Sequence, residues 1–239
     1  MTGQQGMGPN TELIPPLGAA WRDLDMVDLL CQPTAFISIS QVNSLYSPDG
    51  AQADERQWER GSLENTIAVA RAARELGAQF FWIGYDIFRS GYPKSPMDAS
   101  QFASWEEPFA DWSDAKKRWD GELTPELKAL VQRDDVEMKE VALQSSFVGT
   151  DLEMHLRRRG TRTIVFTGAH LDWCIEGNSR HARDLGYMPI VVGDACACER
   201  REDEPAALRR INNYFAPVIS AEDTVKLMDE ARLRKELAA

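Results

Sequence analysis

Cys174 stands in the part of the sequence best suited to carry out chemistry. The run Ile164–Thr167 is β-branched and aromatic, which predicts a buried strand that ends at Gly168. A short loop follows, and an amphipathic segment opens at Cys174 and runs to Gly186. A thiol in the first turn of a helix meets backbone N–H groups that favour the thiolate, which is the nucleophilic form. We therefore predict an activated cysteine at the carboxyl edge of a sheet, where the ligands of open α/β sheets collect.

A nucleophilic thiol needs a base, and two nearby residues are of a suitable type. His170 lies four residues before Cys174 and can act as the general base, with Asp172 to orient it. Asp86 follows another predicted strand, Phe80–Gly84, and reaches the same edge of the sheet. Structural interpretations compete with these, because a loop histidine often serves only as a hydrogen-bonding group and most cysteines are inert core residues.

The elements around these residues alternate between strands and helices, which predicts a three-layer αβα fold with a mainly parallel sheet. Ser62 is the expected N-cap of one helix and Gly77 its end. We expect residues 1–32 to be a partly disordered N-terminal extension, and residues 33–239 to be one domain. The predicted strands are Thr34–Ser40, Phe80–Gly84, Val136–Leu143, Thr163–Thr167 and Pro189–Gly193, and the later helices are Asp151–Arg159, Ile175–Leu185 and Ala221–Leu237.

An aromatic-rich insertion at about residues 88–120 interrupts the alternation. Its tryptophans, Trp105 and Trp112 among them, are interleaved with acidic residues and prolines. Long insertions of this kind are typical of an active-site lid or a subunit contact. The alternative is a local satellite core. As part of a lid, Trp105 and Trp112 would line the substrate pocket, and the substrate would be planar or partly apolar.

The composition of the 239 residues is that of a globular protein, with 43% hydrophobic and 27% charged residues. A net charge of −11 argues against nucleic acid or an anionic membrane as the partner, but not against a small-molecule substrate. Four cysteines without framework spacing, and no signal peptide in the first residues, predict a cytoplasmic protein. The three histidines lack ligand spacing and no glycine-rich phosphate loop is present, so we predict neither a metal nor a cofactor.

Two stretches of the sequence carry a family resemblance. Residues Gly168–Glu176 read Gly-Ala-His-Leu-Asp-Trp-Cys-Ile-Glu, and Ser145–Leu152 reads Ser-Ser-Phe-Val-Gly-Thr-Asp-Leu. Together with the residues up to Cys198, they resemble the isochorismatase-like cysteine hydrolases. That superfamily includes nicotinamidases, N-carbamoylsarcosine amidases and ureidoacrylate hydrolases. The resemblance extends from about residue 33 to residue 228.

The resemblance implies a triad of a cysteine, an aspartate at the end of the first strand and a lysine after a central strand. Cys174 corresponds to the nucleophile. Backbone N–H groups of Cys174 and of Leu171 or His170 would form the oxyanion hole, next to a cis peptide bond within Ala169–Leu171. The resemblance also implies a homo-oligomer, a dimer or a tetramer.

The other two members of the triad depart from the family pattern. Ser40 stands at the aspartate position, in the same motif as Asn43, and a hydroxyl is a poor base at neutral pH. The lysine position corresponds to Val141, and Lys139 lies two residues earlier. Lys139 is a catalytic candidate if its loop is longer than usual, and otherwise a solvated lysine. We expect Ser40, Asn43 and Asp86 to contact the substrate.

We predict a metal-independent cysteine hydrolase that cleaves a C–N bond of a small amide, ureido or carbamoyl compound through a thioester at Cys174. Two alternatives belong to other classes. An isochorismatase-type vinyl-ether hydrolase needs mainly the first-strand acid, which Ser40 does not supply. A non-catalytic binding homologue fits the departures at the aspartate and lysine positions. Replacing Cys174 distinguishes the three.

Overall fold

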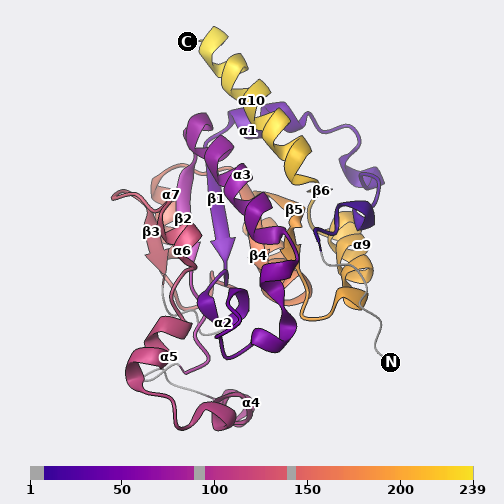
Figure 1. Cartoon of the computed structure of the whole chain (residues 1–239). Helices are drawn as coiled ribbons and strands as arrows, with labels where there is room; N and C mark the ends of the chain where they lie inside the picture. The colour runs from indigo at the N-terminus through magenta and orange to yellow at the C-terminus, as the bar shows by residue number, and fades with distance from the viewer. Residues whose placement is uncertain (1–7, 89–94, 139–143, 239) are drawn as a thin grey trace.

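The computed structural model describes residues 8–88, 95–138 and 144–238. Within these ranges a six-stranded sheet has the order β3-β2-β1-β4-β5-β6, and every neighbouring pair is parallel (Figure 1). The predicted parallel α/β sheet is therefore confirmed. The strands are β1 (Thr34–Ile39), β2 (Gln79–Ile83), β3 (Val136–Met138), β4 (Thr163–Ala169), β5 (Met188–Ala197) and β6 (Val218–Ile219).

Helices cover both faces of this sheet, which gives the three predicted layers (Figure 1). On one face, α3 packs on β1 and β5 and is joined by α1 and α10; on the other face lie α7, α8 and α9. The helices are α1 (Met26–Cys31), α2 (Asn43–Tyr46), α3 (Ser62–Leu76), α4 (Pro96–Glu106), α5 (Asp114–Asp120), α6 (Pro125–Lys128), α7 (Leu152–Arg158), α8 (Glu176–Asp184), α9 (Glu204–Tyr214) and α10 (Ala221–Ala238).

The central strands supply the core on both faces of the sheet. Every residue of β1 and of β4 is buried. Because side chains alternate along a strand, Phe36 joins the core under α3 and α10, whereas Ile37 and Ile39 join the core under α7 and α8. Burial on two faces explains why these strands are nearly continuous apolar runs rather than alternating ones.

The ends of α3 confirm one predicted signal and correct another. Gly77 ends the helix in the left-handed conformation, with φ of 81°, as predicted. Ser62 is not the N-cap: Gly61 holds that position, also left-handed, and Ser62 is the first helical residue. Its hydroxyl is instead buried 3.2 Å from the Tyr46 hydroxyl. Burial raises the pKa of Tyr46 to about 12, so the phenol stays neutral in this polar cluster.

The described part of the N-terminal extension packs on the domain. The extension contains the short helix α1, which packs against α10. Asn10 Nδ2 donates to Glu204 Oε2 at 2.9 Å, and the Trp21 indole donates to the Asn212 carbonyl. Asn10 Nδ2 also lies 3.2 Å from the Cys196 carbonyl of β5, so residues 8–32 pack against α9, α10 and the end of β5.

The aromatic-rich insertion forms α4 and α5 beyond the carboxyl ends of the strands, at the bottom of Figure 1. The shorter turns of the fold are η1 (Thr11–Leu13), η2 (Ala19–Trp21), η3 (Ala53–Glu55), η4 (Gln57–Glu59), η5 (Glu107–Phe109) and η7 (Arg201–Asp203). No helix within the described ranges combines the length and apolar character needed to cross a bilayer.

Candidate active site

Cys174 lies in a π-helical turn, η6 (Leu171–Ile175), between β4 and α8. Two sequence predictions are corrected here. The strand does not end at Gly168 but continues to Ala169 through a shift of register against β5. The regular helix does not open at Cys174 but at Glu176, because the carbonyl of His170 accepts from the N–H of Ile175, five residues on, and so widens the first turn. Cys174 thus lies between the strand and the helix, as the sequence predicted, but in a π-helical turn rather than in the first turn of an α-helix.

The backbone around the turn has two unusual features. The Ala169–His170 peptide bond is cis, which confirms the bond that the family resemblance implied. Ser40, at the carboxyl end of β1, has a φ of 56° and is buried. Its N–H donates to the Ile83 carbonyl of β2 at 2.8 Å. Ser40 and η6 thus both lie at the carboxyl ends of the central strands.

Asn178 anchors the turn that carries Cys174. Its fully buried side chain donates to the Cys174 carbonyl at 2.8 Å and to the Gln144 carbonyl at 2.9 Å. Its Oδ1 accepts from the N–H of Ser146 at 2.9 Å. The sequence prediction missed this residue, although its position one helical turn after Cys174 is a signal. Asn178 connects the turn of Cys174 to the Ser-Ser-Phe stretch that begins at Ser145.

His170 is paired with a residue that the sequence did not suggest. Its Nε2 lies 2.7 Å from Oε2 of Glu55, and each side chain is only 7% exposed. The expected partner, Asp172, interacts instead with the thiol of Cys198, whose pKa is raised by burial and by the Asp172 charge. Glu55 belongs to η3 and is 115 residues away in the sequence, so a local pattern does not reveal the pair.

Cys174 lines two cavities at the carboxyl edge of the sheet. The larger has a volume of about 90 Å³, and Trp105 of α4 lies in its wall. The smaller, about 10 Å³, contains Ser40. Trp105 and Ser40 therefore each share a cavity with Cys174, and their contact with a substrate stays a prediction. His170 is not among the described residues lining either cavity. The other lining residues are Tyr85, Asp98, Gln101, Phe102, Gln144 and Trp173 in the larger cavity, and Ile39, Ile83, Gly84, Tyr85, Gln144 and Ser146 in the smaller.

Three other predicted contact residues lie in different surroundings. Asn43 Nδ2 donates to the Trp119 carbonyl at 2.8 Å and so joins α2 to α5. Trp112 packs against Phe109 and Phe88, with ring centroids 4.7 and 5.9 Å away. The Leu171 side chain is fully buried in the core, so only its backbone can serve the predicted oxyanion hole.

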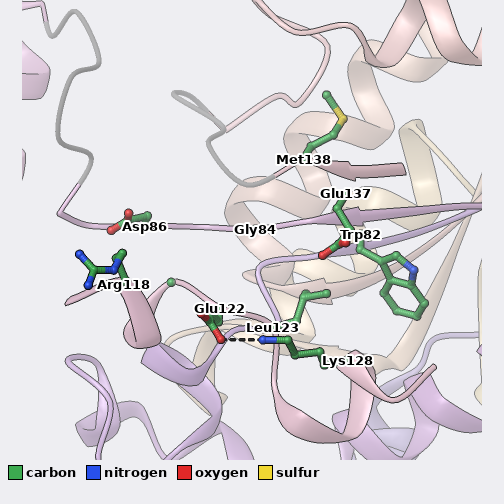
Figure 2. A pocket seen from close by; sticks show the side chains of 10 residues that line it. Trp82, Gly84, Asp86, Arg118, Glu122, Leu123, Lys128, Glu137 and Met138 are labelled. Carbon is green, nitrogen blue, oxygen red and sulfur yellow. Dashed lines mark hydrogen bonds and ion pairs between the residues drawn. The ribbon is translucent and has the colours of Figure 1, made fainter. Parts of the chain in front are cut away.

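Asp86 lines a separate cavity of about 280 Å³ (Figure 2). Figure 2 shows Asp86 and Arg118 at one end of this cavity and Trp82 at the other, with the Glu122–Lys128 ion pair between them. The predicted base is therefore not among the described residues that line the two cavities of Cys174, although Gly84 lines both this cavity and the smaller of those two. Lys139 and Val141, the two positions considered for the family lysine, lie outside the described residues.

Glu176, two residues after Cys174, is held as a carboxylate by arginines. Burial raises the pKa of this carboxyl, but hydrogen bonds from Arg210 and Arg180 outweigh burial and bring the pKa below its usual value. Arg210 Nη2 lies 2.5 Å from Oε2. Because both of its oxygens are engaged, Glu176 connects the start of α8 to α9 rather than serving as a base.

The Glu55–His170 pair should hold η6 in place. Removing one partner leaves a buried polar group without its hydrogen bond, so we expect Glu55→Ala to lower the free energy of unfolding by about 1–3 kcal/mol. Glu55→Gln keeps an acceptor for His170 and should lose less than about 1 kcal/mol. Urea denaturation measures both, with Asp54→Asn, an exposed neighbour, as the control. Equal losses for the alanine and glutamine variants would contradict a role for the hydrogen bond.

Comparison with known proteins agrees with this geometry. The family model of the isochorismatase domain matches residues 34–223. Ureidoacrylate amidohydrolase RutB of Stutzerimonas stutzeri is 30% identical over 202 residues, which cover 79% of this chain and 80% of that protein. A cysteine hydrolase from Pseudomonas syringae pv. phaseolicola has a similar structure, with a TM-score of 0.69, 20% identity, and 91% of this chain and 99% of the other covered. N-carbamoylsarcosine amidase from Thermoplasma acidophilum superimposes with a TM-score of 0.58 at 22% identity over 80% of this chain and 97% of the other. The chain belongs to the isochorismatase family.

Proposed function

We propose that this chain hydrolyses a C–N bond in a small amide, ureido or carbamoyl compound, with Cys174 as the nucleophile. The observation that carries the proposal is the position of Cys174, in a turn at the carboxyl edge of the sheet and in the wall of two cavities. The names of the relatives, an amidohydrolase and an amidase, support cleavage of a C–N bond.

In the proposed reaction, Sγ of Cys174 bonds to the carbonyl carbon of the substrate. The thiol proton passes to the nitrogen, the C–N bond breaks, and ammonia or an amine leaves. Water then adds to the thioester, releases the acid and returns the proton to the thiol. Backbone N–H groups of η6 would hold the oxyanion, as preorganised donors do in acyl transfer.

His170 serves in this proposal as a positioning group rather than as the base. Its Nε2 is engaged by Glu55, and its ring lies nearly parallel to that of Trp173, the residue before the nucleophile, with centroids 6.2 Å apart and an interplanar angle of 26°. Through these contacts the Glu55–His170 pair supports the orientation of η6.

The vinyl-ether alternative is weaker because of Ser40. That reaction requires an acid at the end of the first strand, and Ser40 supplies only a hydroxyl beside Cys174. A hydroxyl neither holds nor donates a proton readily at neutral pH, so the vinyl-ether route lacks its main catalytic group. The thioester route also lacks the family aspartate, but it keeps its nucleophile, Cys174.

The test is to trap the covalent intermediate. The protein is incubated with a panel of amides, ureas and carbamates, the reaction is stopped with acid, and the peptide that contains Cys174 is analysed by mass spectrometry. We expect ammonia or amine release and a hydroxylamine-sensitive mass increase equal to the acyl group. Turnover without an adduct on Cys174 would contradict the thioester, and neither turnover nor adduct across the panel would favour the binding homologue.

A further inference from the structure

The cavity beside Cys174 has aromatic walls that meet nearly at right angles. Phe102 and Trp105 of α4 have centroids 5.1 Å apart with an interplanar angle of 84°. Trp105 and Trp173 have centroids 5.8 Å apart with an angle of 83°. Tyr85 adds a fourth ring to the lining. Rings arranged edge to face form the sides of a box rather than one flat stacking surface.

The polar groups of this cavity influence the sign of the electrostatic potential inside it. Asp98 is the charged side chain among the described residues that line it, and the amides of Gln101 and Gln144 complete the polar part. The N–H and the hydroxyl of Ser95 both donate to Oδ2 of Asp98, at 3.1 and 2.8 Å. Within the described residues, Oδ1 of Asp98 accepts no hydrogen bond.

We propose that this cavity selects a substrate with a positively charged nitrogen, an ammonium or quaternary ammonium group, near the carbonyl that Cys174 attacks. The faces of aromatic rings carry negative potential and attract a cation, and aromatic boxes are a recurrent solution for ammonium groups. The carboxylate of Asp98 adds a full negative charge. The net charge of −11 on the chain acts in the same direction over longer distances. The inference rests on the proposed function in one respect only, namely that the substrate has a carbonyl group that Cys174 attacks.

An anionic substrate fits these groups less well. The N-terminus of α4 would favour an anion through its backbone N–H groups, but Asp98 already occupies that position in a capping box with Ser95. A carboxylate in the cavity would face the Asp98 charge and the negative faces of the rings. A neutral planar group would gain the aromatic contacts but nothing from Asp98.

Binding of three carbamoyl compounds to the full-length Cys174→Ala variant tests the charge preference without turnover. The probes are carbamoylcholine, its uncharged carbon isostere 3,3-dimethylbutyl carbamate, and the anion N-carbamoylglycine. Isothermal titration calorimetry gives the three dissociation constants. We expect carbamoylcholine to bind at least about tenfold more tightly than its isostere, and N-carbamoylglycine to bind most weakly.

Two further substitutions in the same variant assign the preference to named groups. Asp98→Asn keeps the cap of α4 and should remove most of the advantage of the cation over the isostere. Trp105→Leu should weaken the cation more than the isostere, while Trp112→Leu, outside the cavity, should change neither. Equal binding of cation and isostere, stronger binding of the anion, or no binding of the cation would overturn the inference.

Turnover by the unsubstituted protein separates this inference from the proposed function. Preferential binding of carbamoylcholine without hydrolysis of any member of a wider amide panel would leave the recognition intact and remove the proposed reaction. Hydrolysis that favours neutral or anionic members of the panel would support the proposed reaction and contradict the preference for a cation.

Discussion

Replacing Cys174 with alanine is expected to lower kcat/KM for the amide, ureido or carbamoyl substrate by at least about 10³-fold, because the attacking atom is removed. Serine at the same position should lose nearly as much, since an alcohol is far less nucleophilic than a thiol near neutral pH. The thiol is half-buried at the wall of a cavity, so we expect the free energy of unfolding to change by less than about 1 kcal/mol. Steady-state kinetics and urea denaturation measure the two effects separately.

Cys31 offers a matched control for this substitution. It is also half-buried, but it lies in α1, where its thiol contacts the Ala231 carbonyl of α10 at 3.6 Å. Cys31→Ala should leave kcat/KM unchanged. If Cys174→Ala spares hydrolysis of a vinyl ether, the isochorismatase-type alternative is correct. If it leaves amide turnover within tenfold of the original value, Cys174 is not the nucleophile.

The elements that position Cys174 could be predicted because their signals are local. The apolar runs of β1 and β4 indicate strands buried on both faces, and Gly77 marks the end of α3 through its positive φ. The alternation of these strands with helices then predicts the parallel sheet, and the sheet determines which loops meet at its carboxyl edge.

The surroundings of Cys174 could not be predicted in the same way, since they come from distant segments. Glu55 reaches His170 across 115 residues, and the Ser146 N–H reaches Asn178 across 32. No periodicity connects such residues. Only the packing of η3 and of the Ser-Ser-Phe stretch against η6 brings them together.

The aromatic insertion illustrates a third limit of sequence-based prediction. Trp105 and Trp112 are seven residues apart, which in one continuous helix would place them on the same face. The helix α4 ends at Glu106, however, and Pro108 lies in the following turn, η5. The two tryptophans therefore do not share a helix: Trp105 lines the cavity beside Cys174, while Trp112 packs against Phe88 and Phe109. Local aromatic packing therefore describes the surroundings of Trp112, and the lid stays a prediction.

Gly168 should be the glycine whose substitution is most damaging to the fold. It lies inside β4 next to β1, with φ of 124°, in a region that residues with a side chain rarely adopt. A Cβ at this position would overlap the Ile39 carbonyl oxygen and lie 2.8 Å from the carbonyl carbon. Because the obstacle is the backbone of a fully buried strand, no side chain can rotate to make room. We expect Gly168→Ala to lower the free energy of unfolding by about 3 kcal/mol or more, as measured by the midpoint of urea denaturation.

Gly186 separates the two contributions to this loss. It also has a positive φ, of 87°, but an added Cβ would meet nothing within 4 Å. Gly186→Ala therefore carries only the conformational cost, about 1–2 kcal/mol. The additional loss in Gly168→Ala measures the close approach of β4 to β1 at the edge where Ser40 and η6 meet. Equal losses for the two variants would mean that β1 and β4 separate readily there. The two strands would then not keep Ser40 and Cys174 in fixed positions around the cavity that both line.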